Sequence, residues 1–166
     1  MPDATPATLA LRVPAPDDWR YRQKLCLDRD TMTHNAPHGD NVVDGTVYLS
    51  EEYLRDWFTR FPASGGYYAY VTLDGQPIGE VSVSPKLGNQ VSVTIEARHR
   101  GNGYGKAALR LVCDKAFREL GYAYLTDTFE PERTAAERAF ADVGFERVDN
   151  EYVRLFRERY FALSAG

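Results

Sequence analysis

The segment from Val91 to Thr128 constrains the fold more than any other part of the chain. Apolar and polar residues alternate over 91–95 as they do in a strand, and residues 122–128 have a second strand-like pattern. Between them, residues 103–120 carry apolar side chains at helical spacing: Leu109, Val112, Cys113, Ala116, Phe117 and Leu120. A helix that joins two neighbouring strands of one sheet is a crossover, and a crossover makes the two strands parallel. We therefore expect a sheet that contains at least one parallel pair.

The rest of the chain adds shorter elements to this unit. Further strands are predicted at residues 9–13, 68–73 with a return strand to Val83 across an Asp74-Gly75 turn, 145–148 and 152–156. Further helices are predicted at about residues 17–29, 50–62 and 131–143, the last ending at Gly144. Residues 31–49 have no helical period and are predicted to form a long loop. The order predicts an α/β fold of the mixed α+β kind, with about seven mostly antiparallel strands and helices on both faces of the sheet.

Size, charge and cysteine content exclude several classes of protein. Residues 1–7 are predicted to be a disordered tail and residues 8–166 a single domain. The net charge of −4 argues against a general nucleic-acid binder, which needs a basic surface. No apolar run approaches the roughly 18 residues of a membrane helix, and the N-terminus lacks the features of a secretion signal. Cys26 and Cys113 fall within predicted helices, so we expect two buried thiols in a reducing cytoplasm.

The charge is unevenly spread along the chain. From Asp30 to Leu54 there is no Lys or Arg, whereas the acidic residues of this stretch are Asp30, Asp40, Asp44, Glu51 and Glu52. Two interpretations stay open. The stretch is either a solvated acidic loop or a lip that attracts a cationic substrate.

Three glycines at alternate positions, Gly101, Gly103 and Gly105, precede the long helix directly. Because glycine has no side chain, successive backbone N–H groups can point at one anion, and the start of the helix adds a partial positive charge. The basic residues around the turn are Arg98, Arg100, Lys106 and Arg110. The combination predicts a phosphate-binding turn.

Two known phosphate motifs fit this turn poorly. A P-loop needs glycine five residues before Gly105 and Ser or Thr after Lys106, but Arg100 and Ala107 stand there. The dinucleotide fingerprint matches at Gly103-x-Gly105-x-x-Ala108. However, the charged link EARHR separates the strand from the first glycine, and too few residues follow for a usual dinucleotide domain.

Arg100-x-x-Gly103-x-Gly105 resembles the Gln/Arg-x-x-Gly-x-Gly/Ala motif of the GNAT superfamily of acyl-CoA-dependent N-acyltransferases. VSVTIEARHRG is similar to that family's fourth strand and the link beyond it, and AERAFADVGFERV is similar to its later helix, which ends at Gly-Phe. The resemblance spans about residues 9–160. It implies an enzyme that transfers an acetyl group from acetyl-CoA directly to a primary amine, without a metal.

The resemblance also implies how coenzyme A is held. The pyrophosphate would lie on the backbone from Arg100 to Lys106, and the pantetheine arm would pair with the preceding strand. The coenzyme-binding residues predicted in this way are Val93, Ile95, Ala97, Arg98, Arg100, Gly101, Asn102, Gly103, Tyr104, Gly105 and Lys106.

Acetyl transfer to an amine requires that the amine lose a proton and favours a proton donor near the departing thiolate. Glu96, at the strand end, and Glu80, on the neighbouring strand, are candidate bases. Many family members carry a tyrosine donor four residues before the Gly-Phe pair, where this chain has Phe140. The donor is then Tyr152 or a water molecule, or the thiolate leaves unaided. Alternatively, the chain is an acyl-CoA-binding or sensing module without turnover.

The resemblance places the amine acceptor between the first helices and the last hairpin. The polar residues of that region are His34, Asn35 and His38, which are candidate acceptor contacts. His34 and His38 lack a clear third ligand for a metal. The aromatic residues that could line the acceptor cleft or pack at its rim are Tyr48, Tyr53, Trp57, Tyr67 and Tyr68. The acceptor is expected to be a small molecule or a peptide amine, and similar proteins are often homodimers.

Overall fold

The computed structural model describes residues 6–32, 42–43 and 45–165. Its main sheet has seven strands in the order β1-β4-β5-β6-β7-β9-β8. Their bounds are β1 Leu9–Arg12, β4 Tyr67–Leu73, β5 Gln76–Ser84, β6 Gln90–Ile95, β7 Tyr124–Thr128, β8 Glu146–Arg147 and β9 Tyr152–Phe156. All neighbours pair antiparallel except β6 and β7, which are parallel. The mixed, mostly antiparallel sheet and the parallel pair are as predicted.

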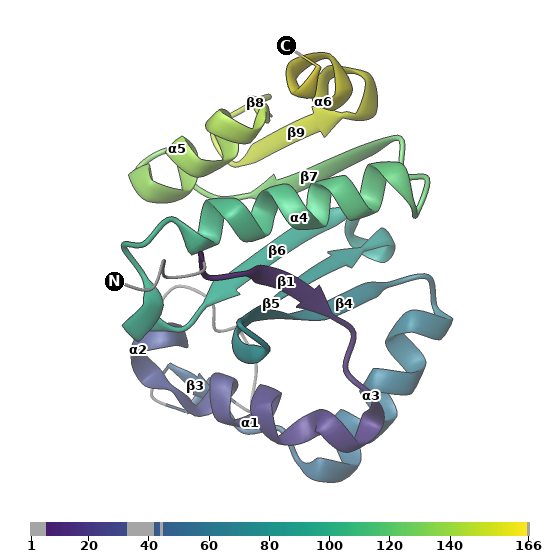
Figure 1. The fold of residues 1–166 in the computed structure, drawn as a ribbon, viewed down its shortest axis with the longest axis vertical. Coiled ribbons are helices and arrows are strands. Elements are labelled where there is room, and N and C mark those ends of the chain that lie inside the picture. The colour runs from purple at the N-terminus through teal and green to yellow at the C-terminus, as the bar shows by residue number, and fades with distance from the viewer. Residues whose placement is uncertain (1–5, 33–41, 44, 166) are drawn as a thin grey trace.

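The helices lie on both faces of the sheet (Figure 1). Their bounds are α1 Trp19–Leu27, α2 Arg29–Met32, α3 Glu51–Ala63, α4 Tyr104–Arg118, α5 Thr134–Val143 and α6 Arg157–Ser164. Short 3-10 turns are η1 Pro16–Asp18, η2 Pro85–Leu87 and η3 Ala97–His99. None of the helices in the described part of the chain is long and apolar enough to cross a membrane.

Each face of the sheet has its own apolar cluster, because side chains alternate along a strand. In β4, Ala69 and Val71 face α4 and join the larger cluster with Leu109 and Phe117. Tyr68 and Tyr70 face the opposite way and pack with α1 and α3. Cys113 and Cys26 are buried in these two clusters as free thiols, as predicted. Burial raises the pKa of both thiols, that of Cys26 to about 11.

The parallel pair at the centre of the sheet separates along its length. β5 and β6 pair from Gly79↔Ile95 to Ser84↔Gln90, whereas β6 and β7 are paired only at Gln90↔Thr126. Beyond that point the two strands diverge toward the N-terminus of α4. One edge of β6 is therefore open at its C-terminal end.

The structure corrects the predicted long loop at residues 31–49. Thr31 and Met32 belong to α2, and β2 (Val42–Val43) pairs with β3 (Thr46–Val47) as a small second sheet. Two-residue strands are too short to produce an alternating pattern. The C-terminal helix α6 was also not predicted, since its apolar residues have no helical periodicity; its Tyr160 nevertheless packs on Phe117 with ring centroids 5.2 Å apart.

Candidate active site

The turn between β6 and α4 holds its glycines in two different roles. Gly101 and Gly103 have φ of +81° and +80°, the left-handed region that side chains other than glycine rarely adopt. Gly105 lies inside the first turn of α4, and a Cβ added there would approach nothing closer than Ile95 Cγ1 at 3.9 Å. Gly101 and Gly103 therefore shape the turn, while Gly105 keeps the space in front of it open.

The backbone N–H groups of this turn have no partner among the described residues. Among the hydrogen bonds that join described residues, none is donated by an N–H from Gly101 to Lys106. The first backbone bond of α4 runs from Ala107 N–H to the Gly103 carbonyl, at 3.1 Å. A row of free donors at a helix start is the arrangement that binds phosphate groups.

The open edge of β6 continues from these donors. Glu96 donates its N–H to Ile78 O on β5 at 2.9 Å. Because backbone groups alternate in direction along a strand, the N–H and C=O groups of Ile95 and Val93 point the other way, toward β7. The strands have already diverged there, so an extended ligand could pair with this edge.

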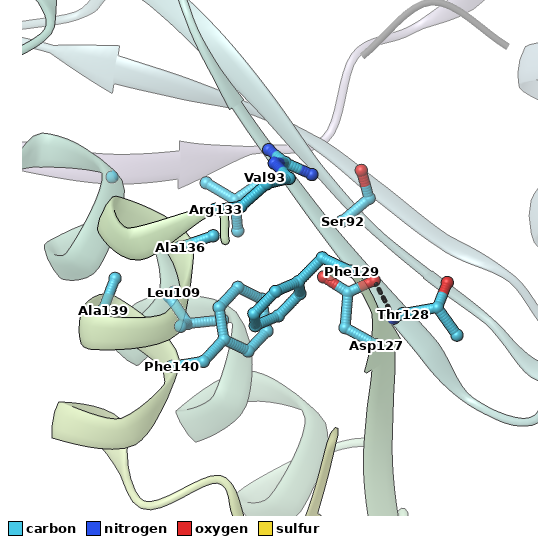
Figure 2. A pocket seen from close by; sticks show the side chains of 11 residues that line it. Ser92, Val93, Leu109, Asp127, Thr128, Phe129, Arg133, Ala136, Ala139 and Phe140 are labelled. Atoms are coloured by element: carbon cyan, nitrogen blue, oxygen red, sulfur yellow. Dashed lines mark hydrogen bonds between the residues drawn. The ribbon is translucent and has the colours of Figure 1, made fainter. Parts of the chain in front are cut away.

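Two cavities follow the divergence of β6 and β7. The larger, of about 530 Å³, contains the open edge of β6, the glycine turn and the exposed face of α5; its lining residues include Val93, Ile95, Arg100, Gly101, Gly103, Tyr104, Gly105 and Lys106. The smaller, of about 290 Å³, lies deeper between β7 and α5 (Figure 2). Most of the predicted coenzyme-binding residues are thus brought together. Ala97, Arg98 and Asn102 line neither cavity.

The basic side chains around the turn are mostly engaged elsewhere. Arg100 donates to the carbonyl oxygens of Asp30 and Thr31, at 3.2 and 2.8 Å, and so fixes α2 against the turn. Lys106 pairs with Asp142 at 3.1 Å. Arg138 of α5 also lines the larger cavity and has no hydrogen bond or ion pair with another described residue. Sequence reasoning missed Arg138, which only the packing of α5 beside the turn brings to this site.

Asp127 is a second residue that sequence reasoning did not place in the site. Its carboxylate lines the smaller cavity and accepts hydrogen bonds from Gln90 Nε2 at 3.2 Å and from the N–H of Thr128 at 2.8 Å. Burial raises the pKa of Asp127 to about 6, the two hydrogen bonds offsetting part of the shift. A carboxylate here is therefore costly to ionise.

A third cavity, of about 580 Å³, lies on the opposite face of the sheet, under α1 and α3. Ser92 and Thr94 of β6 line this cavity and also line the cavities on the α4 face. The cavities on the two faces of the sheet therefore meet at Ser92 and Thr94. Of the aromatic residues considered above, Tyr53, Trp57 and Tyr68 line the third cavity, whereas Tyr48 is exposed and Tyr67 packs against the α4 side.

The two candidate bases have different surroundings. Glu80 lines the third cavity, pairs with Thr94 across the β5–β6 ladder and accepts a hydrogen bond from the Tyr68 hydroxyl. Glu96 is buried outside the three cavities, and its carboxylate accepts a hydrogen bond from Arg98 Nε at 2.7 Å. Glu80 is therefore the carboxylate beside the meeting point of the cavities.

The remaining predicted residues are placed as follows. Tyr152 pairs with Thr128 in the β7–β9 ladder and lines none of the three cavities. The Phe140 ring lies beside Phe129 in the smaller cavity, with centroids 5.1 Å apart (Figure 2). His34, Asn35 and His38 lie outside the described residues. Within the part that is described, no three His, Cys, Asp or Glu side chains form a metal-binding group.

The chain is similar to a family model and to several solved structures of acetyltransferases. Residues 8–146 match the family model of the acetyltransferase (GNAT) domain. Spermidine N-acetyltransferase from Vibrio cholerae, in complex with CoA and spermine, superposes with a TM-score of 0.74 at 15% identity, covering 92% of this chain and 98% of that one. A putative acetyltransferase from Salmonella typhimurium with acetyl-CoA gives 0.68 at 16% identity, covering 92% and 95%.

Another similar structure is an aminoglycoside acetyltransferase in complex with coenzyme A and kanamycin, with a TM-score of 0.71, 15% identity and coverage of 95% and 99%. No curated protein matches the chain by sequence. At these identities the structural likeness establishes the fold, and the family model, which covers most of the chain, establishes the family. The chain belongs to the GNAT family of acetyltransferases.

Proposed function

We propose that this enzyme transfers the acetyl group of acetyl-CoA to a primary amine. The observation that carries the proposal is the row of free N–H groups from Gly101 to Lys106, continuous with the open edge of β6. The similar structures named above hold CoA or acetyl-CoA, and two of them hold spermine or kanamycin, which are amines. The buried thiols support a reducing compartment, the cytoplasm. A homodimer stays a prediction.

In the proposed complex the pyrophosphate binds at the glycine turn. The free N–H groups and the N-terminus of α4 meet its oxygens, and Arg138 and Lys106 supply positive charge. The pantetheine arm pairs with Val93 and Ile95 as an additional strand. This places the thioester near Thr94, where the cavities of the two faces meet.

The acceptor enters from the third cavity, and its amine attacks the thioester carbonyl carbon. A C–N bond forms, the C–S bond breaks, and coenzyme A leaves as a thiolate. Glu80 is the proposed base, directly or through a water molecule, because it lies beside Thr94 and lines the acceptor cavity. Glu96 is held by Arg98 and lines none of the three cavities assigned to the coenzyme and the acceptor, so we assign it no proton transfer.

The thiolate must end as a thiol, and Phe140 offers no proton. Tyr152 lines none of the cavities, so we propose that water supplies this proton. A thiol of pKa near 8.5 is a good leaving group, and its departure does not require a strong donor. Starting from the ammonium form of the acceptor, the nitrogen loses two protons and the thiolate takes up one, so the reaction balances with one proton released to solvent.

The test combines binding and turnover. Isothermal titration with acetyl-CoA measures the coenzyme site, and release of free thiol measures transfer across a panel of polyamines, aminoglycosides, amino acids and short peptides. Release that depends on one class of amine would confirm the proposal. Tight binding of acetyl-CoA without release for any amine would support the sensing role instead, and the absence of binding would contradict both.

A further inference from the structure

The third cavity contains one cation and one anion among its described lining residues, Arg22 and Glu80. Arg22 Nε lies 3.5 Å from Glu80 Oε2, which is an ion pair without a hydrogen bond of normal length. The remaining lining is apolar, aromatic or uncharged polar, including Met32, Leu49 and Phe61. The cavity therefore offers two opposite charges side by side on a largely neutral wall.

The Arg22 guanidinium packs against aromatic rings, and two of its nitrogen atoms have no hydrogen-bond partner among the described residues. It lies 3.8 Å from the Trp57 ring centroid and 4.9 Å from that of Tyr68. Its Nε and Nη1 atoms are buried and have no hydrogen-bond partner among the described residues. Its side chain is only 17% exposed. The centroids of these two rings are 5.0 Å apart, so the rings lie beside each other and not on opposite faces of the guanidinium. Because Arg22 lines the third cavity, its unmet donors lie at the wall of that cavity.

Unmet donors of a buried guanidinium are costly, and the group that matches their planar geometry best is a carboxylate. A carboxylate bound to the Arg22 edge would lie close to Glu80, because the two charged groups are neighbours. In an α-amino acid, the carboxylate and the amine are both bonded to the α-carbon. Its two charges therefore match the spacing of the Arg22–Glu80 pair. A polyamine would bring a second cation against Arg22.

We propose that the amine acceptor is an α-amino acid with an apolar or aromatic side chain, whose carboxylate binds the edge of Arg22 while its amine faces Glu80. This inference rests on the proposed acetyl transfer and specifies its acceptor. The apolar part of the cavity, near Phe61 and Leu49, receives the side chain of the substrate. The product is an N-acetylated amino acid, which keeps the carboxylate that Arg22 binds.

The experiment compares acceptors that differ only at the carboxylate. Thiol release from acetyl-CoA is measured with L-phenylalanine, L-phenylalaninamide and phenethylamine, with the same three forms of leucine and methionine, and with spermidine. The α-ammonium group of the amide loses its proton more readily than that of the amino acid. A preference set by this proton loss alone would therefore favour the amide. We expect kcat/KM to be about 10- to 100-fold higher for an amino acid than for its amide.

The variant Arg22→Gln tests the assigned contact. It should reduce the ratio of amino-acid to amide kcat/KM by about tenfold or more, because the charged partner of the carboxylate is lost. Arg20→Gln is the matched control, since Arg20 is an exposed arginine of the same helix that stacks on Trp19. The control should leave the ratio unchanged. Circular dichroism and acetyl-CoA affinity check that each variant is folded.

The outcomes separate the two proposals. Equal or better use of the amides, the decarboxylated amines or spermidine by the wild-type enzyme would overturn the carboxylate inference and leave acetyl transfer intact. A preference for amino acids that Arg22→Gln does not change would overturn the role of Arg22. If acetyl-CoA binds and no acceptor of any kind releases thiol, the proposed function fails, and the acceptor inference fails with it. The wild-type comparison decides even if Arg22→Gln does not fold.

Discussion

At the scale of single residues, glycine has two roles in the turn before α4: it permits a left-handed backbone, and it leaves space for a ligand. Gly101 and Gly103 are required by their positive φ values, which a side chain would strain. Gly105 has ordinary helical geometry and room for a Cβ, so the fold does not require glycine there. A substitution at Gly105 can therefore test the phosphate site without testing the fold.

We predict that Gly105→Glu abolishes measurable binding of acetyl-CoA in isothermal titration. The carboxylate would enter the cavity at the proposed pyrophosphate site and repel it. The protein should stay folded, since an acidic residue in the first turn of a helix is favourable by about 0.3–1 kcal/mol. Gly105→Gln, of equal size and no charge, is the control and should bind more tightly than Gly105→Glu. Unchanged affinity in Gly105→Glu would place the phosphates elsewhere.

The Asp127 carboxylate predicts a pH effect on stability. Its pKa is about 6 in the fold against an ordinary value of 3.8, so the folded protein binds this proton more tightly than the unfolded chain. The contribution of Asp127 to stability therefore falls as the pH rises from about 4 to about 6 and stays low above that. Asp127→Asn should raise the free energy of unfolding at pH 8 by up to about 3 kcal/mol.

Denaturant unfolding of both proteins from pH 4 to pH 8 measures this effect. Asn keeps an oxygen for the hydrogen bonds from Gln90 and Thr128, so the comparison isolates the charge. The advantage of the variant should disappear near pH 4. A difference that is constant across the pH range would mean that ionisation of Asp127 is not its cause.

At the scale of elements, the β5–β6 ladder determines where the site lies. Gly79 is opposite Ile95, and a Cβ added to Gly79 would come within 2.2 Å of the carbonyl oxygen of Thr94. The absence of a side chain lets β5 approach β6 at the point where Glu80 and Thr94 pair. This contact places the proposed base beside the proposed thioester.

We predict that Gly79→Ala lowers the free energy of unfolding by about 1–3 kcal/mol, as overpacking in a core does. It should also lower kcat, because the shifted strand moves Glu80 relative to Thr94. Denaturant unfolding and thiol release measure the two effects. Gly105→Ala is the matched control for stability, since its Cβ would meet no atom closer than 3.9 Å. A Gly79→Ala protein as stable as wild type would show that β5 and β6 can move apart at this point without a loss in the free energy of unfolding.

At the scale of the whole molecule, the divergence of β6 from β7 leaves the sheet incomplete. The two strands are paired only at Gln90↔Thr126, yet α4 and α5 cover both strands on one face. In the proposed complex the pantetheine arm completes this part of the sheet. Binding should therefore stabilise the centre of the molecule as a unit.

We expect acetyl-CoA at 100 times its dissociation constant to raise the free energy of unfolding by about 2.7 kcal/mol, as linkage requires. Hydrogen exchange should slow most at the amides of Val93, Ile95 and the turn from Gly101 to Lys106, whose N–H groups have no partner among the described residues. Exchange of the β1–β4 ladder is the internal control and should change only as global stability does. Protection elsewhere, with these amides unchanged, would contradict the proposed position of the coenzyme.

The sequence alone determined the local features of this protein. Alternating residues in the strands, the apolar stripe of α4 and the glycines of the turn depend on neighbours within a few positions, so the parallel crossover and a glycine turn at the start of α4 could be predicted. Phosphate binding by this turn stays a prediction. The predictions failed where the local pattern was weak. The strands β2 and β3 have only two residues each, and the apolar residues of α6 do not recur at helical spacing.

Only the tertiary structure decided which side chains share a site. Glu80 and Glu96 are equivalent candidates in the sequence, and packing separates them: Glu80 lines the third cavity, whereas Glu96 pairs with Arg98 and does not line that cavity. Arg22 and Trp57 come from different helices, and nothing in either segment predicts a guanidinium stacked on a ring above Glu80. Such contacts join residues far apart in the chain, so their chemistry depends on the fold and not on local pattern.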